Sequence, residues 1–232
     1  AQTGTGKTAA FVLPMLQKMI EEPTLYQKRV PRVLVLTPTR ELAAQVGETI
    51  LSLGKDLGVR SAVVFGGVGI NPQKAAIAKG LDFLVATPGR LLDLMNQGFA
   101  GLSKTHILIL DEADRMLDMG FLPDLKRILK ALPPDRQTLL FSATFSPEIK
   151  KLASEFLNKP ESVEIERNKD SSLVRQTLYR VPKANKHTVL RDLIVDNQWD
   201  QVLVFTRTKY GADKLVRHLL KDGLVAKAIH GD

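Results

Sequence analysis

Short apolar runs alternate with longer amphipathic stretches along most of the chain. Five runs, each of four or five residues and rich in Val, Ile and Leu, lie at Val33–Thr37, Ser61–Phe65, Phe83–Thr87, Ile107–Leu110 and Thr138–Phe141. Runs of this kind are typical of strands that are buried on both faces of a parallel sheet. Helical patterns between them predict helices at Thr8–Ile20, Arg40–Leu57, Pro72–Lys79, Gly89–Asn96, Leu122–Ala131 and Pro147–Leu157.

This alternation predicts an α/β fold with a doubly wound parallel sheet and helices on both faces. In such folds ligands bind beyond the carboxyl ends of the strands. The polar motifs at 38–43, 66–67, 87–90, 111–114 and 142–144 all begin within a residue or two of the end of an apolar run. We therefore expect the chemistry of the protein to lie at that edge of the sheet.

The pattern breaks near residue 166 and then starts again. Residues 166–172 are polar and have no periodicity, which indicates an exposed linker over 166–175. Beyond it the sequence predicts strands at Gln176–Val181, Val202–Thr206 and Ala226–Ile229 and helices at Lys186–Asp196 and Tyr210–Lys221. The expected organisation is one α/β domain at 1–165 and the first part of a second at 176–232.

Composition narrows the class of protein. Of the 232 residues, 44% are hydrophobic, as in a soluble protein with a buried core. No apolar run approaches the roughly 18 residues of a membrane-spanning helix, so no membrane is expected among the partners. The absence of cysteine excludes disulfides and thiolate zinc sites. A net charge of +8 suits a polyanionic partner, but it suits a merely basic surface equally well.

Residues 1–8 resemble a phosphate-binding loop, since they end in Gly-Lys-Thr and lead into an apolar helical stretch. The backbone amides of Gly4, Thr5 and Gly6 can surround phosphate oxygens at the positive end of that helix. Lys7 can reach the terminal phosphates of ATP, and the Thr8 hydroxyl can bind Mg²⁺. A Gly- and Thr-rich helix start without a ligand is the alternative.

A pair of carboxylates follows the fourth apolar run. Asp111, at the end of a predicted buried strand, is suited to hold Mg²⁺ against the phosphates. Glu112 follows it and can orient or deprotonate the attacking water. Acidic residues also favour helix N-termini, so this pair alone does not decide the question.

Taken together, the motifs resemble those of DEAD-box ATP-dependent RNA helicases of superfamily 2, along the whole chain and in the family's order. They are AQTGTGKT at 1–8, PTRELA at 38–43, Gly66-Gly67, TPGR at 87–90, DEAD at 111–114, SAT at 142–144, VLVFTRT at 202–208 and HGD at 230–232. Longer strings such as FGGVGINPQ are most similar to the bacterial RhlE-type branch. The resemblance implies two RecA-like domains and a chain that lacks both ends of the family pattern.

The resemblance also implies residue roles. Lys7, Asp111 and Glu112 would be catalytic, and Thr8 and Asp111 would hold the metal. Coupling of the nucleotide site to domain closure would depend on Asp114, Ser142, Ala143 and Thr144. The RNA backbone would be bound, without regard to sequence, by Pro38, Thr39, Arg40, Gly66, Gly67, Thr87, Pro88, Gly89, Arg90, Phe205, Arg207, Thr208, Gly231 and Asp232.

The implied activity is ATP-dependent separation of short RNA duplexes, or remodelling of RNA–protein complexes, in the cytoplasm. Ribosome-assembly or RNA-decay proteins are the implied protein partners. Two alternatives remain open: a non-catalytic RNA clamp gated by ATP, and a DNA-directed helicase of the same superfamily. We expect the 232 residues by themselves to be inactive, because family motifs before residue 1 and after residue 232 are missing.

Overall fold

The computed structural model describes residues 6–22, 30–163 and 175–230. The chain divides into two compact units, 1–167 and 168–232, and each is considered by itself. Most of the predicted linker at 166–175 lies outside the described residues.

A five-stranded parallel sheet forms the centre of the first unit. Its strands are paired in the order β2-β3-β1-β4-β5. Their bounds are β1 Val33–Leu36, β2 Ser61–Val64, β3 Phe83–Ala86, β4 Ile107–Leu110 and β5 Gln137–Leu140. This is the doubly wound parallel sheet that the apolar runs predict, and it is RecA-like, as the family resemblance implies.

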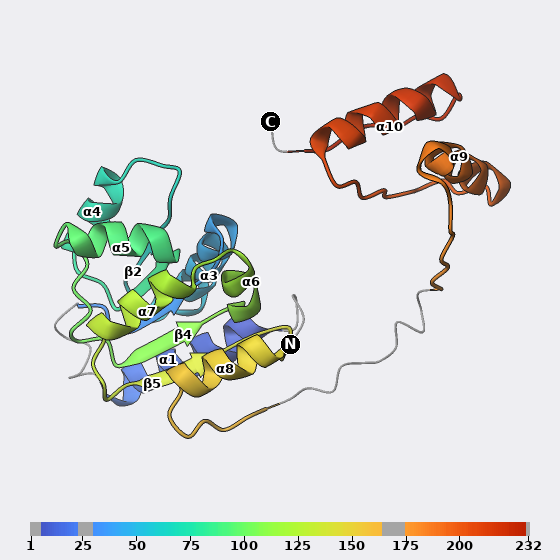
Figure 1. Ribbon diagram of the computed structural model, residues 1–232. Coiled ribbons are helices and arrows are strands. Elements are labelled where there is room, and N and C mark those ends of the chain that lie inside the picture. Colours follow the sequence, from blue (N-terminus) through green and yellow to red (C-terminus); the bar gives the residue numbers. More distant parts are fainter. Residues whose placement is uncertain (1–5, 23–29, 164–174, 231–232) are drawn as a thin grey trace. The chain divides into compact units, whose positions relative to one another are not determined.

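Helices connect the strands and cover both faces of the sheet (Figure 1). They are α1 Lys7–Glu21, α3 Arg40–Leu53, α4 Asn71–Ala78, α5 Pro88–Asn96, α6 Ala113–Asp118, α7 Leu122–Ala131 and α8 Pro147–Phe156, with a short 3₁₀ turn at Lys55–Leu57. In the part of the chain that is described, no helix is both long and apolar enough to cross a membrane.

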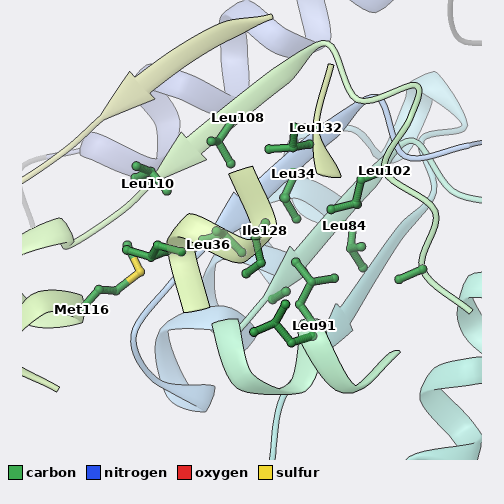
Figure 2. Packing of buried hydrophobic residues seen from close by; sticks show 14 of the residues in the cluster. Leu34, Leu36, Leu84, Leu91, Leu102, Leu108, Leu110, Met116, Ile128 and Leu132 are labelled. Carbon is green, nitrogen blue, oxygen red and sulfur yellow. The ribbon is translucent and has the colours of Figure 1, made fainter. Parts of the chain in front are cut away.

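The core has two layers because alternate strand residues point to opposite faces. One layer packs Val33, Val35 and Ile109 against α1 and α3. In the other, Leu34, Leu36, Leu84, Leu108 and Leu110 pack against α5, α6, α7 and α8. Figure 2 shows how the leucines of the second layer meet Leu91, Met116 and Ile128 from the covering helices. Burial on both faces explains why every position of β1, β3 and β4 is apolar.

Two features of the first unit differ from the prediction by more than one residue. The helix expected to run to Leu57 ends at Leu53, where the Gly54 amide donates to the Ile50 carbonyl and a 3₁₀ turn follows. Gly58, at a φ of 64°, then turns the chain toward β2. The short helix α6, of six residues, was not predicted.

The second unit contains α9 at Lys186–Asp196 and α10 at Lys209–Lys221, both as expected to within a residue. The three strands predicted in this unit are wrong for the structure, since none of the residues from 175 to 230 pairs as a strand. A strand needs a hydrogen-bonded neighbour and a surface to bury against. Here Leu203 and Ile229 stay 76% and 92% exposed, so these apolar runs have neither.

Candidate functional site

The predicted site residues of the first unit lie along one edge of the sheet. Backbone pairing continues one residue beyond β1, β3, β4 and β5: Thr37 donates to Ala86, Thr87 to Val64, Asp111 to Leu36, and Phe141 to Leu110. The strand order therefore groups the motifs. The motifs after β2, β3 and β1 follow one another along the edge, and those after β4 and β5 continue the row, because β1 and β4 are also paired.

The phosphate-loop prediction can be followed from Gly6 onward, since Gly4 and Thr5 lie outside the described residues. Gly6 caps α1 with a φ of 79°, a conformation that favours glycine. Lys7 and Thr8 form the first turn of α1, where the positive end of the helix dipole favours a phosphate. The charge of Lys7 also reaches Asp111 and works to lower its pKa.

Asp111 is buried at the end of β4, with one carboxylate oxygen accepting a 3.0 Å hydrogen bond from the Glu112 amide. Burial raises the pKa of Asp111, Lys7 acts against that rise, and the nearby Glu112 adds to it. An ionised carboxylate in such a place is costly unless a cation offsets it. A buried carboxylate of this kind suits a divalent cation, for which Asp111 and the Thr8 hydroxyl are the candidate protein ligands.

Glu112 has an unusual backbone for a residue with a side chain. Its φ and ψ are both 52°, in the left-handed region, where most such residues pay a conformational cost. This turn directs the chain from β4 into α6, and only 13% of the Glu112 side chain stays exposed. Its carboxylate lies 3.3 Å from the Arg115 guanidinium.

Arg115 was missed by the sequence analysis. It lies three residues after Glu112, and that spacing predicts a contact only if the segment is helical. Because α6 was not expected, the pairing was not expected either.

The residues predicted to couple the nucleotide site to domain closure lie close together. The carboxylate of Asp114 accepts two 3.0 Å hydrogen bonds from Thr144, one from the amide and one from the hydroxyl. The buried Ser142 hydroxyl donates to the Thr144 carbonyl at 2.7 Å. Ala143 is exposed in the same turn. The segment after β5 is thus fixed to the helix that follows Asp111.

At the end of β1, two threonines shape the start of α3. The Thr37 hydroxyl donates to the Thr39 carbonyl at 3.2 Å, and the Thr39 hydroxyl accepts from the Leu42 amide at 3.4 Å. Arg40 is exposed and pairs with Glu41 at 2.6 Å. Pro38 is buried in this turn.

The guanidinium of Arg40 lies beside the glycine pair that follows β2. A Cβ atom added to Gly67, which has a φ of 80°, would be 3.8 Å from Arg40 Nη1. A Cβ added to Gly66 or to Gly89 would meet nothing within 4 Å. A ligand backbone can therefore approach these glycines closely, with a cation next to them.

Arg90, after β3, faces inward more than the sequence suggested. Only 10% of its side chain is exposed, and Nη2 donates to the Val68 carbonyl at 3.0 Å. Its Nε lies 3.9 Å from Asp93. Thr87 and Pro88, next to it, are buried. Arg90 thus contacts the loop after β2 in this structure.

In the second unit, the turn before α10 repeats the arrangement found before α3. The Thr206 hydroxyl donates to the Thr208 carbonyl at 3.0 Å, and the Thr208 hydroxyl accepts from the Gly211 amide at 3.0 Å. Phe205 and Arg207, beside this turn, are exposed. The remaining predicted residues of this unit, Gly231 and Asp232, lie outside the described residues.

Comparisons with known proteins identify the family of the chain. The DEAD/DEAH box helicase family model matches residues 1–152. The ATP-dependent RNA helicase RhlB of Pseudomonas putida is 41% identical to the chain. The match covers 100% of the chain and 60% of RhlB. DEAD-box ATP-dependent RNA helicase 30 of Arabidopsis thaliana is also 41% identical, and the chloroplastic DEAD-box ATP-dependent RNA helicase 3B of Zea mays is 44% identical. Both matches cover all of the chain, and they cover 40% of helicase 30 and 32% of helicase 3B.

The chain thus spans between about a third and 60% of the curated relatives it matches. The family model covers well over half of the chain, from the phosphate loop to α8. Within that range lie the buried Asp111 and its helix α6, at the end of a central parallel strand. This chain belongs to the DEAD/DEAH box helicase family.

Proposed function

We propose that this chain acts as the ATP-hydrolysing, RNA-binding core of an ATP-dependent RNA helicase. The proposal is supported above all by the division of one sheet edge into two adjoining groups of residues. Carboxylates and a lysine gather after β4 and at the start of α1, while glycines and the exposed Arg40 gather after β1 and β2. Nucleotide and polyanion would then bind side by side.

We call the group after β4 and at the start of α1 the nucleotide half, and the group after β1 and β2 the RNA half. In the nucleotide half, the amides of the first turn of α1 and the Lys7 ammonium would bind the phosphates. Mg²⁺ held by Asp111 and Thr8 would neutralise developing charge on those phosphates. Glu112 would take a proton from the attacking water at its carboxylate. The pairing of Asp114 with Thr144 would carry the change at this site to the rest of the protein.

In the RNA half, Arg40 and the backbone of the glycine pair would bind the sugar–phosphate chain. None of these groups reads base edges in such a setting, so we propose sequence-independent binding that weakens with salt. Duplex separation, a cytoplasmic location and ribosome-assembly or RNA-decay partners are further parts of this proposal and rest on the family resemblance. The RhlE-type branch stays a prediction from sequence strings such as FGGVGINPQ alone.

The two alternatives differ in measurable ways. A non-catalytic clamp does not need Glu112, whose strained turn places a carboxylate next to the proposed metal ligand. A DNA-directed helicase would be stimulated by DNA. Phosphate release by the full-length protein, measured with RNA and with DNA of the same sequence, separates the three functions.

The decisive variant is Glu112→Gln in the full-length protein, with Glu48→Gln, an exposed carboxylate of α3, as the control. Loss of a general base should slow RNA-stimulated phosphate release about 100-fold or more, while ATP still binds and RNA dissociates more slowly. Glu48→Gln should behave as wild type. Turnover at the wild-type rate by Glu112→Gln would contradict its role, and equal stimulation by DNA would favour the second alternative.

A further inference from the structure

A buried glutamine holds one end of the exposed loop at residues 66–69. Gln73, in the first turn of α4, is only 8% exposed. Its Oε1 accepts from the Phe65 amide at 3.2 Å, and its Nε2 donates to the Phe65 carbonyl at 3.1 Å. Nε2 is also 3.5 Å from the Gly69 carbonyl. The side-chain amide thus bonds to both polar groups of Phe65, as a neighbouring strand would.

The position of Phe65 explains why its backbone needs the two hydrogen bonds from Gln73. Phe65 directly follows β2, and β2 is an edge strand with β3 as its one neighbour in the sheet. Among the described residues, no backbone of the sheet lies beyond this edge to pair with Phe65 on its outer side. Leaving both groups unpaired in a partly buried place would be unfavourable.

The other end of the same loop is held by Arg90. Its Nη2 donates to the Val68 carbonyl at 3.0 Å, and its side chain is nine-tenths buried. Gln73 and Arg90 come from different helices, α4 and α5, and they bind carbonyls at 65, 68 and 69. Both side chains therefore restrain the loop from the protein side and leave its outer side open.

The loop has little besides its backbone to offer a ligand. Residues 66–69 are all exposed, and three of the four are glycine. Gly67 has a φ of 80°, which an unrestrained chain of glycines would adopt only part of the time. A site that binds through its backbone loses affinity in proportion to the fraction of time it spends in other conformations.

We propose that Gln73 is a positioning residue for RNA binding, and that it acts with Arg90 by keeping the 66–69 loop in its binding conformation. The inference rests on the proposed function, since it assumes that RNA is the ligand of this loop. Gln73 does not touch the ligand. Its effect reaches RNA through Phe65 and Gly69, and it brings the glycine pair to Arg40, 3.8 Å from the Cβ position of Gly67.

The test uses two variants of the full-length protein. Gln73→Met fills a similar volume without hydrogen bonds, and Gln73→Glu keeps an acceptor for the Phe65 amide but loses the donor to the two carbonyls. Gln45→Ala, an exposed glutamine of α3, is the control. The RNA concentration that gives half-maximal ATPase stimulation and the KM for ATP are measured for each protein.

We expect both Gln73 variants to need about 10-fold more RNA, since hydrogen bonds of this kind each contribute roughly a factor of five. The KM for ATP should change less than about twofold, because the nucleotide half of the edge is not touched. Hydrogen exchange should become faster at residues 65–69 and stay slow in β1, β3 and β4. Gln45→Ala should match wild type in every measurement.

Three outcomes would overturn the inference. Unchanged RNA dependence in Gln73→Met, when wild type is stimulated by RNA, would show that the loop does not need this restraint. Equal weakening of RNA and ATP binding would show that Gln73 only stabilises the domain. No stimulation of the wild-type protein by RNA would refute the proposed function itself, and the inference with it.

Discussion

The two halves of the sheet edge differ in how their residues are held. After β4 and β5, side chains bond to one another: Asp114 accepts two hydrogen bonds from Thr144, and the buried Asp111 interacts with Lys7. After β1 and β2, Arg40 and the glycine pair are exposed, and Arg40 pairs with its neighbour Glu41.

This difference fits the two ligands that we propose. A phosphate group and a metal ion need charges at fixed positions, and buried carboxylates with defined partners provide them. A nucleic-acid backbone needs an open surface, close approach and a cation, and exposed glycines beside Arg40 provide these. If the comparison is right, substitutions in one half should leave the binding step of the other half intact.

The largest effect should come from Lys7→Ala in the full-length protein. Removing a cation that stabilises charge on the transferred phosphate should lower ATPase activity about 100-fold or more, without unfolding the domain. Phosphate release and circular dichroism measure the two effects. RNA affinity without nucleotide should stay within about twofold of wild type.

Lys18→Ala is the matched control for that variant, because Lys18 is an exposed lysine near the other end of α1. It should keep wild-type turnover. A folded Lys7→Ala protein with normal ATP turnover would contradict the assignment of the nucleotide half.

Gly47→Ala should disturb the RNA half through packing. Gly47 lies where α3 crosses β2, and an added Cβ would overlap with Val63 Cγ2. Overpacking of this kind costs roughly 1–3 kcal/mol, so thermal unfolding should occur several degrees lower. Since α3 also carries Arg40, the RNA requirement should rise more than the KM for ATP.

Gly101→Ala, where a Cβ would meet nothing within 4 Å, should leave the melting temperature unchanged. A Gly47→Ala protein as stable as this control would show that α3 can move away from β2 at no cost. The close packing would then play no part in placing Arg40.

A smaller effect is expected from Asp111→Asn. Burial raises the pKa of Asp111, so the folded protein binds the proton more tightly than the unfolded one. The contribution of such a group to stability is fully present below its unfolded pKa and is lost as the pH rises through its folded pKa. At neutral pH the ionised carboxylate therefore lowers the stability of the ligand-free protein.

Asparagine keeps an oxygen for the Glu112 amide and carries no charge. Asp111→Asn should therefore melt at a higher temperature than wild type near about pH 8 without nucleotide or metal, and the difference should shrink toward about pH 4. Thermal unfolding across this range is the measurement. A variant less stable at high pH, or a difference that grows on acidification, would contradict the pKa direction.

The sequence predicts the first unit well because its strands are buried on both faces. Such strands admit only apolar residues, so β1, β3 and β4 are visible as continuous runs, and the motifs follow them directly. The inward orientation of Arg90 could not be predicted. It depends on Val68, 22 residues earlier in the chain, and no local pattern encodes that contact.

The second unit shows the opposite case. Val202–Thr206 has the composition of a buried strand, yet Phe205 is 88% exposed and no neighbouring strand is paired with it. Composition reports what a segment can bury, whereas pairing depends on segments elsewhere in a protein. The helices of the second unit were predictable because the hydrogen bonds of a helix are internal to it.

The division of the edge is tested most directly by Arg40→Ala in the full-length protein, with the exposed Arg127→Ala as the control. RNA affinity is measured across a series of salt concentrations with a non-hydrolysable ATP analogue bound, alongside ATP affinity without RNA. The account predicts RNA binding weaker by about 5- to 10-fold, a salt dependence reduced by roughly one phosphate contact, and unchanged ATP affinity. Unchanged RNA binding, or an equal loss for RNA and ATP, would contradict it.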